Sequence, residues 1–169
     1  MTNTNYKTIA SKIKFEGRAF INGKYVDAID GKKFETINPA TGETLCSVAK
    51  CNSKDVDLAV KVSRKAFNSG VWSRTSPEFR KDVLLKFAEL LRTHGVENSV
   101  LECIDTGKLI GDCINEVAND APMHFQWYGE LIDKVFGKVG PTEPSLTSLI
   151  VKEPIGIVAG VVPWNFPLM

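Results

Sequence analysis

The segment that most constrains the fold is IGIVAGVV, residues 155–162, near the carboxyl end of the 169-residue sequence. A strand formed here would be apolar on both faces, which is typical of the middle of a parallel sheet covered by helices. Parallel neighbours require crossover segments of a dozen or more residues, whereas only seven residues follow Val162. We therefore expect this strand to lack neighbours within the sequence, and we interpret the chain as an amino-terminal portion of a larger α/β protein.

The opening of the sequence predicts antiparallel β structure. Asn22-Gly23 and Asp30-Gly31 are residue pairs that accept the positive φ angles of tight hairpin turns. They separate short strand-like runs within FINGKYVDA and before FETINPATGETLCSVAKC. Near the other end, residues 145–152 predict an exposed or edge strand that Pro154 closes.

Helices are expected between these two β regions. Ser53 and the triplet Ser76-Pro77-Glu78 are helix start signals, and Gly70 and Gly95 are stop signals. Apolar residues then recur at helical spacing. The sequence therefore predicts four helices, over about 53–69, 76–94, 96–104 and 112–136, and Pro122 should kink the last of them.

Composition and charge disfavour several classes of function. The 21 Lys and Arg residues nearly balance the 20 Asp and Glu residues, whereas binding to nucleic acid requires a basic excess. The longest apolar stretch, IGIVAGVVPWNFPLM, is shorter than the roughly 20 residues of a membrane span, so no membrane partner is expected. The four cysteines show no CxxC spacing, which disfavours structural zinc and favours free thiols in the cytoplasm.

Residues 161–169, VVPWNFPLM, carry a resemblance to a known family. The segment resembles the strand-and-loop signature of NAD(P)-dependent aldehyde dehydrogenases. FINGKYVDA, INPATGETL, DVDLAVKVSRKAF, IDTGK and VKEPIGIV are similar to stretches of the same family in the same order. Within the family, WSRTSPEFRKDVLLKFAELL, ECIDTGKLI and WYGELIDKVFGKV look most similar to the γ-glutamyl-γ-aminobutyraldehyde dehydrogenases of putrescine breakdown.

The resemblance implies an α/β fold that is the amino-terminal part of the aldehyde dehydrogenase fold, with an antiparallel β opening, helices and the start of a Rossmann-like parallel sheet. It divides the sequence into a tail (1–19), a β-hairpin and helical part of the cofactor-binding domain (20–139), the strand of an oligomerisation arm (140–154) and the first parallel strand with its PWNFP loop (155–169). It also implies a homodimer or tetramer of the complete protein, and an exposed strand edge is suited to such pairing.

Asn165 is the candidate catalytic residue. In this family a cysteine thiolate adds to the aldehyde carbonyl, and the resulting oxyanion needs fixed hydrogen-bond donors. Asn165 has a neutral amide donor on a short side chain, lies between Pro163 and Pro167, and follows the expected strand, at whose carboxyl end ligands bind. By resemblance it matches the family's oxyanion-stabilising asparagine. The alternative is a turn asparagine that binds its own backbone.

The same loop is the candidate cofactor contact. By resemblance, the residues that line the nicotinamide side of bound NAD or NADP are Val161, Val162, Pro163, Trp164 and Asn165. For Trp164 the alternative is an aromatic side chain that covers the core. The sequence contains no GxGxxG turn, so we expect its share of the cofactor site to be incomplete.

The remaining candidates are thiols and a cation site. The thiols are expected to be buried or inert, because no spacing provides the base and lowered pKa of a reactive thiol: Cys46, Cys51, Cys103 and Cys113. Of these, Cys113 at a helix start is the least unfavourable, and the family's nucleophile and glutamate base are expected outside this sequence. By resemblance, Asp105 and the backbone carbonyl of Ile37 bind a structural monovalent cation, and the alternative for Asp105 is a helix-terminal turn residue.

Taken with the resemblance, the sequence predicts an oxidoreductase that converts an aldehyde, such as an aminoaldehyde of polyamine breakdown, to its carboxylic acid through a cysteine thiohemiacetal. The 169 residues alone are expected to be inactive. Two alternatives stay open. One is a non-catalytic truncated subunit that acts only in oligomer contacts, and the other is an unrelated small α+β binding module.

Overall fold

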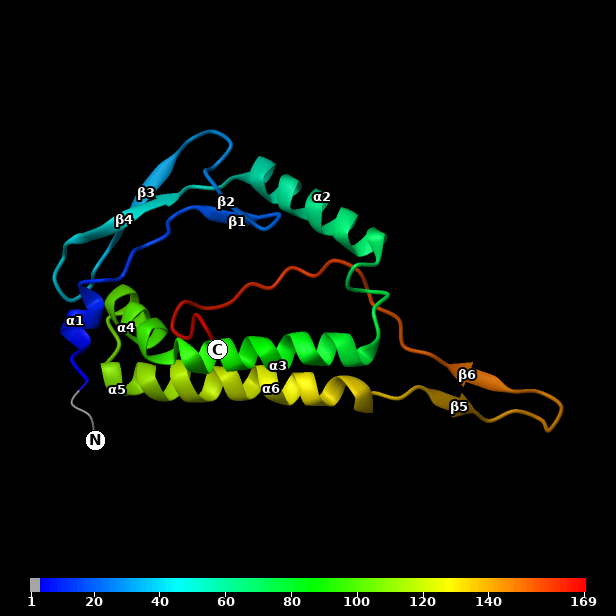
Figure 1. The fold of residues 1–169 in the computed structure, drawn as a ribbon. Coiled ribbons are helices and arrows are strands. Elements are labelled where there is room, and N and C mark those ends of the chain that lie inside the picture. The colour runs from blue at the N-terminus through cyan, green and yellow to red at the C-terminus, as the bar shows by residue number, and fades with distance from the viewer. Residues whose placement is uncertain (1–3) are drawn as a thin grey trace.

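The computed structural model describes residues 4–169 as a β-rich opening, a layer of helices and an extended carboxyl-terminal section (Figure 1). Its elements in chain order are α1 (Tyr6–Ala10), β1 (Ala19–Ile21), β2 (Lys24–Val26), β3 (Lys33–Ile37), β4 (Thr44–Ala49), α2 (Ser53–Ser69), α3 (Pro77–Thr93), α4 (Gly95–Thr106), α5 (Ile110–Cys113), the π-helix η1 (Ile114–Asp120), α6 (Ala121–Leu131), the 3-10 helix η2 (Ile132–Lys134), β5 (Lys138–Gly140) and β6 (Ser148–Ile150). Residues 1–3 of the expected tail lie outside the described residues, and the remainder contains α1, which contacts α4. The division into four segments stays a prediction.

The antiparallel β opening is confirmed. β1 pairs with β2, and β3 pairs with β4. Asn22 and Gly23 have φ angles of 55° and 73°, the left-handed conformation that suits a two-residue turn between right-twisted strands. The register of the second pair shifts between Thr36 and Ile37, at the end of β3.

The amino-terminal cap of α2 differs from the prediction by one residue. Asn52, not Ser53, is the N-cap, and its side chain forms a capping box with Asp55. The buried Asp55 carboxylate accepts hydrogen bonds from the backbone N–H groups of Asn52 and Ile29, both at 2.8 Å. The second bond ties the helix start to the chain after β2, a contact that local sequence does not reveal. As predicted, α2 ends at Gly70, with a φ of 78°.

The core lies where α3, α4, η1 and α6 pack together. The hydroxyl of Ser76 caps α3 by accepting the Phe79 amide at 3.2 Å, as predicted. Phe87 of α3 meets Phe125 of α6 edge-on, with ring centroids 4.7 Å apart. The buried residues of this junction are Ala88, Leu91, Val100, Cys113, Val117, Ala121 and Pro122.

The helix predicted over 112–136 is present as four consecutive pieces, from α5 to η2. The π-helical piece η1 ends two residues before Pro122. Proline lacks an N–H group and its ring crowds the carbonyl four residues earlier, which here belongs to Ala118 of η1. The wider turns of a π-helix accommodate this mismatch. The irregularity therefore lies in the turns before Pro122, not at the proline alone.

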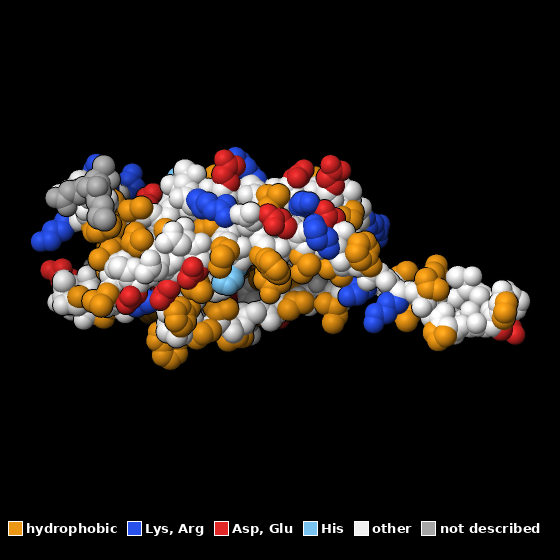
Figure 2. Space-filling model, turned by 90° about the horizontal axis from the view of Figure 1, so that it is seen from below, with side chains coloured by type: hydrophobic (Ala, Val, Ile, Leu, Met, Phe, Trp, Pro, Cys, Tyr) orange, Lys and Arg blue, Asp and Glu red, His pale blue; other side chains and the backbone are white. Residues whose placement is uncertain are grey.

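Several side chains that the helical pattern places inward are exposed. Val56 and Val60 of α2, Phe79 and Val83 of α3 and Tyr128 of α6 are each at least 40% exposed. An apolar stripe is buried only where another element covers it, and no described segment covers these side chains fully. Figure 2 shows hydrophobic side chains gathered along the helical body and on the projecting hairpin.

The carboxyl-terminal section differs most from the prediction. The strand expected over 145–152 is the three-residue β6, which pairs with β5, a strand that the sequence did not indicate. The two form a hairpin that projects from the helical body (Figure 1). The buried strand expected over 155–162 does not form, and Val161 is 98% exposed. A strand exists through ladder hydrogen bonds to a neighbour, and no described residue supplies them to this segment.

No helix within residues 4–169 combines the length and the apolar character that crossing a membrane requires.

Candidate functional site at Lys108 and the carboxyl-terminal loop

The carboxyl-terminal loop, residues 161–169, lies against α4. After the hairpin the chain runs back along the helices and ends near them (Figure 1). Pro167 and Leu168 line a pocket together with Leu101 and Asp105 of α4. Trp164 and Asn165 form a turn just before this contact. The loop singled out in the sequence is therefore packed beside the carboxyl-terminal half of α4.

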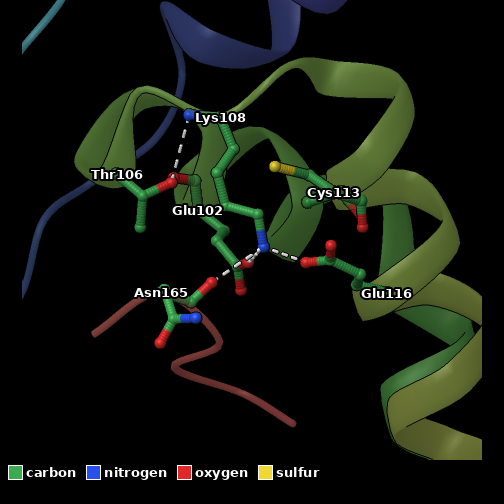
Figure 3. Close-up of polar contacts among 7 residues, drawn as sticks. Glu102, Thr106, Lys108, Cys113, Glu116 and Asn165 are labelled. Atoms are coloured by element: carbon green, nitrogen blue, oxygen red, sulfur yellow. Dashed lines mark hydrogen bonds and ion pairs between the residues drawn. The ribbon is translucent and has the colours of Figure 1, made fainter. Parts of the chain in front are cut away.

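Lys108 is the side chain that joins the loop to the helices. It follows Gly107, whose φ of 76° ends α4 and turns the chain. The Lys108 ammonium donates to the Glu102 carboxylate at 2.9 Å, to the Glu116 carboxylate, and to the backbone carbonyl of Asn165 at 3.1 Å. Figure 3 shows the lysine side chain pointing between the two glutamates toward the main chain of Asn165.

This cluster is shielded from solvent. The side chains of Lys108, Glu102 and Glu116 are 20%, 6% and 19% exposed, respectively. The Thr106 hydroxyl accepts the Lys108 backbone N–H at 3.3 Å and donates to the Glu102 carbonyl at 2.7 Å, which fixes the turn that carries the lysine. Charged groups buried to this degree are stable only when paired and hydrogen-bonded, and here each has such a partner.

The structure places the Asn165 amide where a ligand can reach it. Its backbone carbonyl binds Lys108, whereas its side-chain amide points away from the charged cluster (Figure 3). The residue is exposed. The Asn165 side chain is thus free to donate outward while its main chain is held from behind.

The other predicted cofactor contacts are strongly exposed. Val161 is 98% exposed and Trp164 is 87% exposed. Trp164 therefore does not cover the core of the described chain, which was the alternative for this residue. Val162 and Pro163 are exposed as well. All five predicted cofactor contacts, residues 161–165, are therefore exposed among the residues described.

The predicted cation ligands lie on neighbouring segments. The Thr36 hydroxyl at the end of β3 donates to the Asp105 carboxylate at 3.2 Å, near the end of α4. Ile37 is the next residue of β3. Across residues 4–169, no group of three or more His, Cys, Asp or Glu side chains gathers where it could hold a metal ion. The assignment of Ile37 and Asp105 as oxygen ligands of a monovalent cation stays a prediction.

Two of the four cysteines have a thiol pKa that is raised, which is unfavourable for a nucleophile. Cys113 is 0% exposed, and burial, reinforced by nearby Cys103 and Glu102, raises the pKa of its thiol to about 11. Cys51 is exposed, and desolvation together with the charges of Asp55 and Asp30 raises its thiol pKa as well. A nucleophilic cysteine needs a lowered pKa. Neither thiol meets that requirement.

Sequence reasoning missed the role of Lys108. The residue was visible within IDTGK, but its partners lie 6, 8 and 57 positions away along the chain. A separation of six or eight residues across a helix end follows no regular helical spacing, and the contact to Asn165 is set by the tertiary fold. The one available signal was a lysine directly after a helix-stopping glycine.

Comparisons with known proteins identify the family. Residues 25–169 match the aldehyde dehydrogenase family. The sequence is 41% identical to aminoacetaldehyde dehydrogenase of Pseudomonas aeruginosa over 169 residues, which is 100% of this chain and 34% of that protein.

Solved structures give the same result. Indole-3-acetaldehyde dehydrogenase of P. syringae, in a complex with NAD+ and IAA, has a TM-score of 0.94 and 41% identity, covering 97% of this chain and 33% of that one. Gamma-glutamyl-gamma-aminobutyraldehyde dehydrogenase of Burkholderia cenocepacia has a TM-score of 0.93 and 44% identity, and the match covers 96% of this chain and 33% of that one.

This chain therefore belongs to the aldehyde dehydrogenase family, and its fold is the amino-terminal part of that family's fold. The chain spans about a third of the length of the curated relatives that it matches.

Proposed function

We propose that this chain is the amino-terminal portion of an NAD(P)-dependent aldehyde dehydrogenase that oxidises an aldehyde to its carboxylic acid. The observation that carries the proposal is the PWNFP loop, which is held against α4 with the Asn165 amide exposed, in a chain that matches the family from residue 25 to residue 169. Two similar proteins are an aminoacetaldehyde and a γ-glutamyl-γ-aminobutyraldehyde dehydrogenase, which supports an aminoaldehyde substrate as in polyamine breakdown.

In this proposal Asn165 stabilises the oxyanion that forms when a thiolate adds to the aldehyde. A neutral amide N–H donates to such an oxygen at about 2.7–3.1 Å, and removing one donor of this kind lowers kcat by roughly 10²- to 10³-fold. The exposed, outward-pointing amide of Asn165 supports this role. A fixed main chain favours it further, because a donor that is positioned in advance needs no reorganisation during the reaction.

NAD or NADP is the proposed cofactor, since a similar structure contains NAD+. The described residues do not form a site for it by themselves. Val161, Val162 and Trp164 are each at least 70% exposed, and the sequence contains no glycine-rich phosphate turn. Their proposed contribution is an edge of the site beside Asn165.

The cysteine nucleophile and its glutamate base are not assigned to this chain. Cys113 is buried with a thiol pKa of about 11, and the thiol pKa of Cys51 is also raised. The chain matches about a third of its relatives' length, so the proposal assigns both groups, and the thiohemiacetal chemistry, to the other two thirds.

The test compares two purified proteins in an assay of aldehyde-dependent NADH or NADPH formation at 340 nm. The first is a longer polypeptide, called the longer product below, that contains this chain together with the other two thirds of the length of its relatives. It is expected to oxidise a panel of aminoaldehydes, and Asn165→Ala should lower its kcat by about 10²-fold or more. The 169 residues alone are expected to show no turnover above a heat-denatured control. Turnover by the 169 residues, or its absence in the longer product, contradicts the proposal.

The projecting β5–β6 hairpin supports a dimer or tetramer of the complete protein. Val139, Leu149, Ile150 and Val151 are each at least 55% exposed on or beside it, and an exposed apolar strand edge favours pairing with another chain. The same observation favours the second candidate function, a non-catalytic subunit that acts only in oligomer contacts. Sedimentation of the longer product tests the pairing, and the activity assay separates the two functions. The free thiols support a cytoplasmic location for either one.

A further inference from the structure

The ammonium group of Lys108 uses its full donor capacity in a single arrangement. A lysine ammonium has three N–H donors and no acceptor. Here the three acceptors are a carboxylate oxygen of Glu102, one of Glu116 and the backbone carbonyl of Asn165. Two of these acceptors belong to the packed helical segments α4 and η1, and the third belongs to the carboxyl-terminal loop. The lysine is therefore a bridge from a rigid part of the fold to that loop.

The charges of the cluster hold the lysine in place. Two carboxylates face one ammonium, and the Glu102 side chain is 6% exposed. Charge-assisted hydrogen bonds are shorter and about twice as strong as those between neutral groups. The two glutamates thus fix the ammonium, and the remaining N–H group is directed at the Asn165 carbonyl.

The loop depends on this bridge for its polar attachment. Among residues 4–169, the bond from Lys108 is the one hydrogen bond described between the loop and the rest of the chain. The same ammonium lies 4.6 Å from the centroid of the Phe166 ring, within the range of a cation–π contact. Lys108 therefore contacts two successive loop residues, Asn165 and Phe166.

We propose that Lys108 is a positioning residue for Asn165, which it holds through the backbone carbonyl while Glu102 and Glu116 hold the lysine. The functional meaning of this role rests on the proposed function, in which the Asn165 amide stabilises an oxyanion. The positioning itself is a property of the 169-residue chain and can be measured without turnover.

The first experiment measures backbone ¹⁵N order parameters for residues 164–168 in the 169-residue chain. The order parameters are expected to be near 0.85 in the unsubstituted chain and below about 0.6 in Lys108→Met, with Lys108→Arg retaining more order. Lys86→Met is the matched control, because Lys86 pairs with Glu89 at 2.7 Å on the surface of α3, where both side chains are more than 60% exposed. Its loop should stay as ordered as in the unsubstituted chain.

A further variant distinguishes loss of the loop contact from misfolding caused by unpaired charges. Lys108→Met leaves two carboxylates unpaired, so Lys108→Met is also combined with Glu102→Gln and Glu116→Gln, which removes both charges. Loss of loop order in this folded triple variant supports the proposal. Unchanged order parameters in a folded Lys108→Met or triple variant overturn it.

The second experiment measures kcat and KM in the longer product. Lys108→Met should lower kcat by about 10- to 100-fold, with KM changed less than about threefold. The reason is that misplacing a catalytic group slows the chemical step more than it weakens the binding of the substrate. Lys108→Arg should recover part of the loss. An unchanged kcat in an active Lys108→Met protein refutes the inference. Absence of turnover by the unsubstituted protein refutes the proposed function, and the order parameters then decide the positioning role alone.

Discussion

Gly95 is a position of close approach between α4 and η1. A methyl group at Gly95 would lie 2.7 Å from Cβ and 2.9 Å from Cα of Ala118. Ordinary contact begins at 3.4 Å, so a Gly95→Ala substitution requires a displacement of about 0.7 Å. Because the contacted atoms are a backbone carbon and the first side-chain carbon, no side-chain rotation can relieve the clash. The two helical segments themselves must move apart.

We expect Gly95→Ala to destabilise the fold by about 2 kcal/mol, within the 1–3 kcal/mol typical of an overpacked core. Alanine is favoured over glycine in helix interiors by up to about 1 kcal/mol, but Gly95 is the first residue of α4, where that gain is smallest. For a chain of this size the midpoint of thermal unfolding should fall by about 4–8 °C. The displacement would also separate Glu102 on α4 from Glu116 on η1, and so weaken the ion pairs that both glutamates form with Lys108.

The assay is urea denaturation followed by circular dichroism at 222 nm. Gly111→Ala in α5 is the matched control, because a methyl group there meets no atom within 4 Å, and it should be neutral or slightly stabilising. Combining Gly95→Ala with Ala118→Gly should recover only part of the loss, because the contact at 2.9 Å with the Cα of residue 118 remains, and a double-mutant cycle measures that coupling. The reasoning is refuted if Gly95→Ala is as stable as Gly111→Ala, or if the cycle shows no coupling to Ala118.

Two further predictions concern stability. Asp55→Ala removes two hydrogen bonds of 2.8 Å from backbone amides and should destabilise the fold by about 3 kcal/mol, measured by urea titration. The control is Asp57→Ala at an exposed position two residues away, which should cost less than about 1 kcal/mol. Equal effects of the two substitutions would contradict the role given to Asp55. Burial raises the pKa of the Cys113 thiol from 9.0 to about 11, so between these values the unfolded chain has lost a proton that the folded chain keeps. Stability from this group is therefore complete below pH 9 and should fall as the pH rises to 11. Urea midpoints measured across this range should fall less steeply in Cys113→Ala, and parallel curves would contradict the burial argument.

Features that depend on neighbouring residues were predictable from the sequence. The Asn22-Gly23 turn, the Ser76 cap and the stop at Gly70 all formed as expected, because each rests on the conformational range or hydrogen bonding of a few adjacent residues. The cap of α2 was misplaced by one residue for the complementary reason. Asn52 and Ser53 are both good caps by type, and the bond from Ile29 to Asp55 fixes the helix start from 26 residues away.

Strands near the carboxyl end were less predictable. Residues 138–140, KVG, are too short to show an alternating pattern, and β5 forms through its pairing with β6. The opposite error occurred at 155–162, where a strongly strand-like composition adopts no strand. Composition sets a preference for extended backbone, whereas a strand requires the N–H and C=O groups of a neighbour.

The sequence by itself determined the family, through the PWNFP loop and the colinear motifs, and it determined the local turns and caps that begin and end the helices. The tertiary structure alone decided what holds that loop. Glu102, Lys108, Glu116 and Asn165 meet because α4 packs against η1 and the carboxyl-terminal segment returns to α4. Such contacts depend on where distant segments lie, and no spacing along the chain encodes them.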